Sequence, residues 1–145
     1  MKEFNKISLR MVCEKTYEYD NSKINSILDV IDFINKQEDI ANNPEENVYC
    51  VAMSNKNQII SFSQIAKGGI NLCNFDTKTL FKSLLLCNAN KFILIHNHPS
   101  GDCTPSKRDI DVTKRIQECS NLLGLEFLDH IVIAQDGYAS CFYSI

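Results

Sequence analysis

The chain has 145 residues, 44% of them hydrophobic, and a net charge of −3 at pH 7. This length and apolar content suit one folded domain with a single core and exclude a disordered chain. A sequence pI near 5.6 gives no support for electrostatic binding to nucleic acid or to an anionic membrane. We interpret the basic pairs at 107–108 and 114–115 as parts of a solvated helix face.

The seven cysteines are scattered along the chain, odd in number and without a C-x-x-C pair. This pattern indicates free thiols in a reducing cytoplasm and not a disulfide framework. The first ten residues lack the apolar core of a signal peptide. Because no apolar run approaches the ~18 residues of a membrane span, we expect a cytoplasmic protein without membrane contact.

The N-terminal third predicts a strand over 7–12 and a helix over 22–37. The helix would be capped by Asn21 or Ser22. Its apolar positions recur at helical spacing, and they are Ile24, Ile27, Leu28, Ile31 and Ile34.

A hairpin is predicted next, after a polar connection over 39–46. The β-rich runs 48–53 and 58–65 flank the turn sequence 54–57. Gly68-Gly69 marks a further turn.

The central part predicts two helices around a buried strand. The first helix, over 76–87, would bury four apolar residues, namely Leu80, Phe81, Leu84 and Leu85. The run 92–95 is continuously apolar, as in a central strand. The second helix would extend from Ser106 to about Leu123, ended by Gly124.

Two closing strands, 127–134 and 138–143, flank Asp136-Gly137. Strands and helices in this order predict an α/β sandwich with a mixed or largely antiparallel sheet.

Two histidines directly follow the predicted central strand. On a strand, side chains i and i+2 project from the same face, so His96 and His98 can reach one point in space. Asp109 lies eleven residues beyond His98. It could be a third metal ligand, or it could only cap the helix together with Ser106. Three protein ligands leave an open position on a tetrahedral Zn²⁺, which is typical of a catalytic zinc.

A zinc hydrolase also needs a base that takes a proton from water. Glu45 and Glu46 both precede the strand over 48–53. Their positions alone do not choose between them.

The spacing of His96, His98, Ser106 and Asp109 resembles the JAMM (MPN+) metalloprotease motif. Longer strings resemble its RadC-like branch in particular, namely 96–102, 104–106, 123–125 and 128–133. The resemblance covers roughly residues 40–143. It implies a JAMM/MPN-like (cytidine-deaminase-like) fold, in which helices flank a central mixed β-sheet. We expect residues 41–145 to form the RadC-like JAB/MPN domain and residues 1–40 to be an N-terminal strand/helix extension of the same domain.

The resemblance also implies roles for single residues. His96, His98 and Asp109 would bind Zn²⁺. Glu46 would be the catalytic base. Ser106 would donate a hydrogen bond to the oxyanion of a tetrahedral intermediate, and it could cap the helix as well.

Two further residues keep more than one interpretation, and a third has a single expected role. His130 either orients a metal ligand through a hydrogen bond or is a structural histidine. Cys103 is an extra thiolate near the metal, an oxidisable residue or loop variation. Asp102 is expected to shape its turn and not to bind metal.

The predicted activity is zinc-dependent hydrolysis of the JAMM type, in which metal-activated water cleaves an amide bond of a peptide or isopeptide substrate. The alternatives are a RadC-type protein associated with DNA repair or recombination, and a metal-containing binding module without turnover. Deubiquitinating members usually have Ser or Thr between the two histidines. This chain has Asn97 there, as RadC-like proteins do. Residues before the core lack the helix-hairpin-helix pattern of longer RadC proteins, which argues against direct nucleic-acid binding.

Overall fold

The computed structural model describes residues 1–8, 10, 12–16, 18, 23–68 and 76–144. The elements follow one another as α1 (Ile27–Gln37), β1 (Asn47–Met53), β2 (Ile59–Lys67), α2 (Thr77–Leu86), β3 (Lys91–Asn97), α3 (Lys107–Leu123), β4 (Glu126–Ala134) and β5 (Gly137–Ser140), before a 3₁₀-helix at Phe142–Ser144. The strand order is β2-β1-β3-β4-β5. Every neighbouring pair is antiparallel except β3 and β4, which are parallel. The predicted mixed, largely antiparallel α/β architecture is therefore confirmed.

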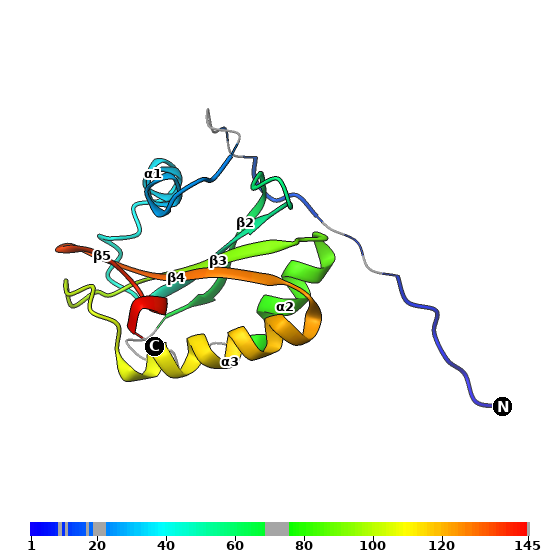
Figure 1. The fold of residues 1–145 in the computed structure, drawn as a ribbon. Helices are drawn as coiled ribbons and strands as arrows, with labels where there is room; N and C mark the ends of the chain where they lie inside the picture. The colour runs from blue at the N-terminus through cyan, green and yellow to red at the C-terminus, as the bar shows by residue number, and fades with distance from the viewer. Residues whose placement is uncertain (9, 11, 17, 19–22, 69–75, 145) are drawn as a thin grey trace.

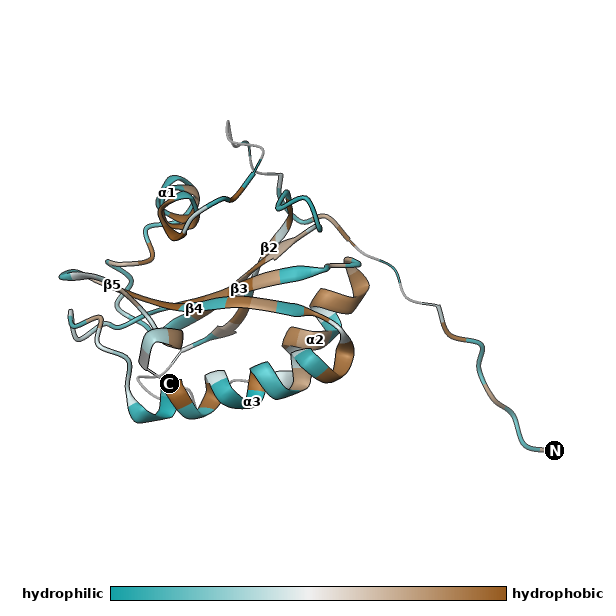
Figure 2. Ribbon diagram, in the orientation of Figure 1, coloured by the Kyte–Doolittle hydropathy of each residue, from teal (hydrophilic) through white to brown (hydrophobic). Residues whose placement is uncertain are grey.

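Helices cover both faces of the sheet. Figure 1 shows α1 against one face and α2 with α3 against the other. Hydrophobic residues run along the central strands (Figure 2). Each helix buries apolar residues in the core, among them Phe33 of α1, Leu84 of α2 and Ile116 of α3. A strand that is buried on both faces reads as a continuous apolar run. This explains why β3 was recognisable in the sequence and why it lies at the centre of the sheet.

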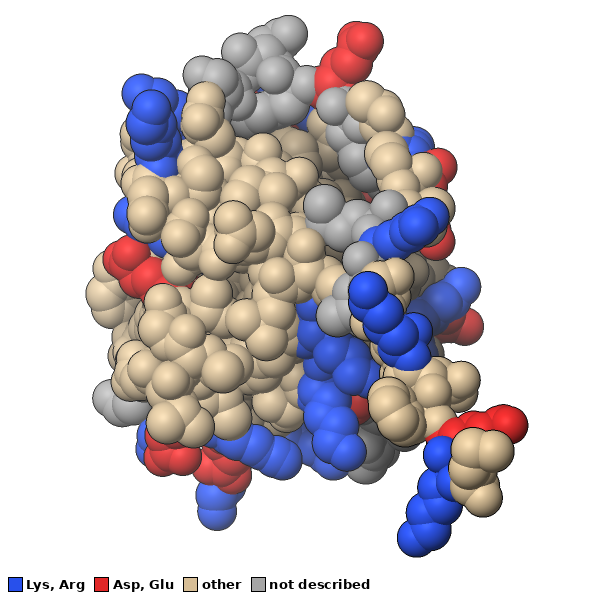
Figure 3. Space-filling model, turned by 90° about the vertical axis from the view of Figure 1, so that its right-hand side faces the viewer, with Lys and Arg blue, Asp and Glu red and all other residues tan. Residues whose placement is uncertain are grey.

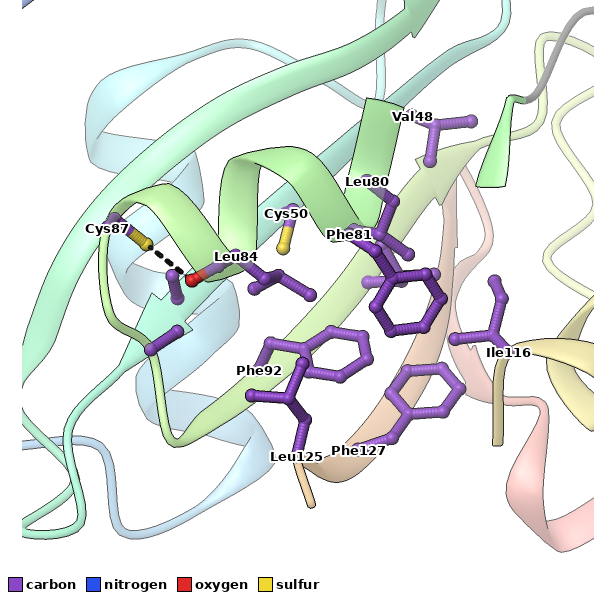
Figure 4. Close-up of a cluster of buried hydrophobic side chains, with 13 residues drawn as sticks. Val48, Cys50, Leu80, Phe81, Leu84, Cys87, Phe92, Ile116, Leu125 and Phe127 are labelled. Carbon is purple, nitrogen blue, oxygen red and sulfur yellow. Dashed lines mark hydrogen bonds between the residues drawn. The ribbon is translucent and has the colours of Figure 1, made fainter. Parts of the chain in front are cut away.

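Aromatic packing ties β3 to β4 and α2 beneath the sheet. The rings of Phe92 and Phe127 stack with their centroids 4.7 Å apart, and Phe81 meets Phe92 edge to face at 6.3 Å. Leu84 and Ile116 fill the space around these rings with no exposed surface, as Figure 4 shows. Interiors packed in this way resist deformation. Strand β3, which carries His96, and helix α3, which carries Asp109, are thereby held in fixed relative positions.

The first helix is shorter than predicted, and its buried face includes residues that the prediction did not name. It begins at Ile27, and Ser26 caps it in a reciprocal capping box with Asp29. The expected cap residues, Asn21 and Ser22, lie outside the described part of the chain. Ile24 precedes the helix, where its N–H donates to the Asn57 carbonyl at 2.9 Å. The helix buries Val30, Phe33 and Ile34, while Leu28 remains exposed.

Helix α2 also differs from its prediction in one position that was expected to be buried. It begins at Thr77, close to the expected start, with Asp76 as its cap, and Leu80, Phe81 and Leu84 are buried. Leu85, predicted to be buried, is 54% exposed. One step along an α-helix turns a side chain by about 100°, so Leu85 points away from the sheet that Leu84 contacts.

The two strands predicted nearest the ends of the sequence differ from the prediction. No strand includes those residues of 7–12 that the structure describes; positions 9 and 11 lie outside them. The last strand ends at Ser140, not at residue 143. The Ser140 hydroxyl accepts the N–H of Phe142 at 3.1 Å, which turns the chain into the 3₁₀-helix.

The predicted turns and the third helix are confirmed where they are described. Asn57 closes the hairpin with φ 60°, and Gly68 has φ 94°, whereas Gly69 is outside the described residues. Ser106 caps α3, and Gly124 ends it in the left-handed conformation at φ 70°.

Among the described residues, every Lys, Arg, Asp and Glu except Glu46 and Asp109 is at least partly exposed. Both basic pairs of α3, at 107–108 and 114–115, are exposed, as predicted for a solvated face. Figure 3 looks at the end of the molecule where α2 and α3 end, and charged residues border a broad uncharged area there. The six described cysteines form no disulfide with one another. Among the described residues, no helix is long and apolar enough to cross a membrane.

Candidate metal centre

Three separate parts of the chain meet at one edge of the sheet. His96 is the second-to-last residue of β3, and His98 directly follows that strand. Asp109 comes from the first turn of α3, and Glu46 directly precedes β1. One potential ligand atom from each of these four residues lies within 4.8 Å of all the others. The sequence-predicted ligands and the predicted base are therefore neighbours in space.

Asp109 both caps α3 and faces the histidines. Its Oδ2 accepts from the Ser106 amide at 2.7 Å and from the Ser106 hydroxyl at 2.6 Å. Its two carboxylate oxygens each lie 3.3 Å from a histidine Nε2, Oδ1 from His96 and Oδ2 from His98. The carboxylate in the capping position therefore also faces both histidines, so capping does not prevent Asp109 from being a metal-ligand candidate.

Both histidines turn Nε2 toward the cluster. His98 Nδ1 lies 2.9 Å from the Asp102 carbonyl, which can only accept, so this nitrogen carries the proton. The Nε2 atoms of His96 and His98 lie 3.0 Å apart beside the Asp109 carboxylate. Two imidazole nitrogens and a carboxylate are the ligand types that Zn²⁺ binds. The residues present therefore fit a zinc ion.

The electrostatics of the cluster also suit a cation. Burial, followed by the charge of Asp109, raises the pKa of Glu46 to about 7. Burial alone would raise the pKa of Asp109 too, but its close contacts with His96 and His98 outweigh burial and hold that pKa well below its usual range. A hydrogen bond to Asp109 raises the pKa of His98. The buried negative charge of Asp109 thus attracts positive charge to this point.

Asn97 positions the segment that carries Glu46. It lies between the two histidines and has no exposed surface. Its Oδ1 accepts from the Asn47 amide at 2.8 Å, and its Nδ2 donates to the carbonyls of Glu45 at 2.9 Å and Asn43 at 3.1 Å. Glu45 itself is exposed, whereas Glu46 is buried against the cluster. The structure therefore brings Glu46, and not Glu45, to the ligands.

The remaining predicted residues take supporting positions. The Asp102 carboxylate accepts from the Thr104 amide at 2.8 Å and so shapes the turn, as expected. Cys103 is not among the four clustered donors. Burial, and then Asp136, raises the pKa of the Cys103 thiol, which favours its protonated form. The idea of an extra thiolate ligand gains no support from this position.

His130 and Thr113 form a buried layer behind His96. His130 Nε2 lies 2.8 Å from His96 Nδ1, and its Nδ1 lies 2.7 Å from the Thr113 hydroxyl. The sequence left His130 open between two roles and did not single out Thr113. The only available signal for Thr113 was its position one helical turn after Asp109, on the inward face of α3.

Comparison with known proteins now places the fold. The profile of the RadC-like JAB domain matches residues 24–143. The chain belongs to the RadC-like JAB domain family. It is 40% identical to a UPF0758 protein of Staphylococcus haemolyticus over 81% of this chain and 51% of the relative. Identity to the UPF0758 protein YsxA of Bacillus subtilis is 42% over 66% of this chain and 42% of that protein.

A UPF0758 protein of Finegoldia magna is 44% identical over 63% of this chain and 41% of its own length. The chain therefore spans about half the length, or less, of these curated relatives. The match to the RadC-like JAB domain profile includes every residue of the cluster, because Glu46 to Asp109 lies within residues 24–143.

Proposed function

We propose that this RadC-like JAB domain is a zinc-dependent hydrolase that cleaves amide bonds in peptide or isopeptide substrates. The observation that carries the proposal is the cluster of Glu46, His96, His98 and Asp109, whose potential ligand atoms lie within 4.8 Å of one another. A purely structural zinc site is closed by four ligands, usually including cysteine. Here the fourth residue is a carboxylate with a pKa of about 7, which suits proton transfer better than permanent ligation.

His96, His98 and Asp109 would hold the ion. When bound, Zn²⁺ supplies Lewis acidity that polarises a substrate carbonyl and acidifies water. His96 and Asp109 are almost fully buried, whereas the His98 side chain keeps 16% of its surface exposed. The site thus opens to solvent on the side of His98, where a substrate can approach.

Glu46 would move the proton. A general base works best when its pKa lies near the working pH, and burial raises the pKa of Glu46 to about 7. At neutral pH a large fraction of Glu46 is ionised and can accept a proton from water. The same carboxyl group, once protonated, can donate to the leaving amine.

Ser106 would donate to the developing oxyanion. It is exposed at the start of α3, directly above the buried Asp109. Its hydroxyl proton is directed at Asp109 Oδ2 over 2.6 Å. To serve a substrate, the hydroxyl must rotate away from that carboxylate while its oxygen continues to cap the helix. Removing an oxyanion donor of this kind typically lowers kcat about 10²–10³-fold.

Metal content is the first test. Purified protein, loaded with zinc and freed of excess metal, would be measured by elemental mass spectrometry beside His98→Ala. We expect about one zinc per chain in the wild type and a large loss in the variant, as for a site with three protein ligands. Equal zinc content in both proteins would refute the assignment of these ligands.

Hydrolysis is the second test. The zinc-loaded protein would be incubated with a fluorogenic peptide library and with peptides joined through a lysine ε-amino group. We expect cleavage of at least one class, lost in Glu46→Gln and retained in Glu45→Gln. Zinc binding without cleavage of either class would instead favour a binding module. Cleavage that survives in Glu46→Gln with zinc still bound would remove Glu46 from the mechanism.

A further inference from the structure

A buried chain of hydrogen bonds starts and ends at the candidate metal centre. The Thr113 hydroxyl lies 2.6 Å from the carbonyl of Asp109 and 2.7 Å from His130 Nδ1. His130 Nε2 in turn lies 2.8 Å from His96 Nδ1. The side chains of Thr113, His130 and His96 are all at most 1% exposed. Water therefore does not compete for these bonds.

The protons in this chain can point in only one direction. A carbonyl oxygen only accepts, so the single hydroxyl proton of Thr113 is given to Asp109. The Thr113 oxygen must then accept the Nδ1 proton of His130. The ring of His130 is 1% exposed, and its two nitrogens face a hydroxyl and a second imidazole. Burying a charge without an oppositely charged partner is costly, so this ring is neutral. A neutral ring protonated at Nδ1 can only accept at Nε2.

The direction is passed on to the metal ligand. Because His130 Nε2 accepts, His96 Nδ1 must carry the proton in the bond between them. His96 Nε2 then keeps its lone pair, and this atom lies 3.3 Å from Asp109 Oδ1. In the opposite tautomer, the Nε2 proton of His96 would occupy the position in which a metal ion must bind.

Ordinary helix geometry does not account for all the contacts of the Thr113 hydroxyl. Threonine and serine inside helices often donate to the carbonyl four residues earlier. Ser120, about two turns further along α3, donates such a hydrogen bond to the carbonyl of Ile116 at 2.7 Å. Thr113 makes the same bond, and in addition it accepts from a histidine on β4. This second contact links the helix that carries Asp109 to the strand pair that carries His96.

We propose that Thr113 and His130 are positioning residues of the metal centre, which hold His96 in the tautomer that can bind the ion. The proposal rests on the proposed zinc site. Asp109 serves the site twice, since its carboxylate faces the ion and its carbonyl fixes the proton order that reaches His96. Losing such an outer partner of a metal-ligating histidine typically weakens metal binding about 10–100-fold.

The chain contains three histidines, all of them in this network, which makes the test direct. Histidine labelled with nitrogen-15 would report each ring tautomer by NMR in chelator-treated protein. Zinc affinity would be measured by competition with a chromophoric chelator. We compare the wild type with Thr113→Val, which keeps the shape but removes the hydroxyl, and with Thr113→Ser, which retains it. Ser120→Ala is the matched control, because it removes the same helical bond away from the site.

We expect Nδ1-protonated rings for His96 and His130 in the wild type and in Thr113→Ser. Thr113→Val should lose this pattern at His130 and bind zinc about 10–100-fold more weakly. Ser120→Ala should match the wild type in both readouts. Unchanged tautomers and zinc affinity in Thr113→Val would overturn the proposal. A wild type that binds no zinc would instead overturn the proposed function, while the tautomers would still report on the network.

A second pair of variants covers the case in which Thr113→Val does not fold. His130→Gln keeps an oxygen that can accept from His96, and His130→Leu does not. We expect His130→Gln to bind zinc more tightly than His130→Leu. Equal zinc affinities for these two variants would show that the acceptor behind His96 has no effect on the ligand, and the proposal would be wrong.

Discussion

The raised pKa of Glu46 makes a quantitative prediction about the stability of the metal-free protein. Glu46 is 7% exposed, and its pKa is raised from 4.5 to about 7, first by burial and then by Asp109. In the unfolded chain the carboxyl group ionises near its ordinary pKa. Between these two pKa values, the unfolded state binds fewer protons than the native state, so the free energy of unfolding falls as the pH rises.

The size of the effect follows from the shift. Each pKa unit corresponds to 1.36 kcal/mol, so the shift to about 7 amounts to about 3 kcal/mol lost between the two pKa values. Below the unfolded pKa both states are protonated and the penalty vanishes. Glu46→Gln removes the charge and keeps the shape. We therefore expect this variant to be about 3 kcal/mol more stable than the wild type near pH 8, and to match it near pH 4.

The assay is urea unfolding of chelator-treated protein at both pH values. Glu45→Gln is the control, because it removes the same charge from an exposed neighbour. This control should change the free energy of unfolding by no more than about 0.5 kcal/mol. Adding zinc should shrink the advantage of Glu46→Gln, since a nearby cation favours the carboxylate. An advantage that is the same near pH 4 and pH 8, or a loss of stability near pH 8, would refute the reasoning.

Four further substitutions test the positions of single side chains. Asn97→Ala removes the clamp on residues 43–47 and leaves a buried amide unpaired; we expect a loss of about 2–4 kcal/mol and faster amide hydrogen exchange in that segment. Unchanged exchange there would contradict the clamp. Leu84→Ala should cost about 2–5 kcal/mol in urea unfolding, whereas Leu85→Ala on the exposed side should cost under about 0.5 kcal/mol. Equal losses would mean that α2 faces another way. Ser106→Ala removes the cap of α3 and should lower thermal stability by about 1 kcal/mol; an unchanged melting temperature would argue against the cap.

The sequence alone was sufficient for most secondary structure and for the metal-ligand candidates. Helix α3 could be placed because both of its ends carry local signals, Ser106 at the start and Gly124 at the end. The histidine pair could be recognised because the two-residue period of a strand puts His96 and His98 on one face. These features depend only on backbone geometry over a few neighbouring residues.

The tertiary structure decided which contacts distant segments make. The Asn97 bond to the Asn47 amide spans 50 residues, and the bond between His96 and His130 spans 34. No local pattern fixes such pairs, because they depend on how β1, β3 and β4 lie side by side. The same packing selects Glu46 over Glu45 by burying it beside Asp109. The sequence therefore predicts which residues are candidate metal ligands. Their protonation, orientation and neighbours are determined only when the sheet and α3 assemble around them.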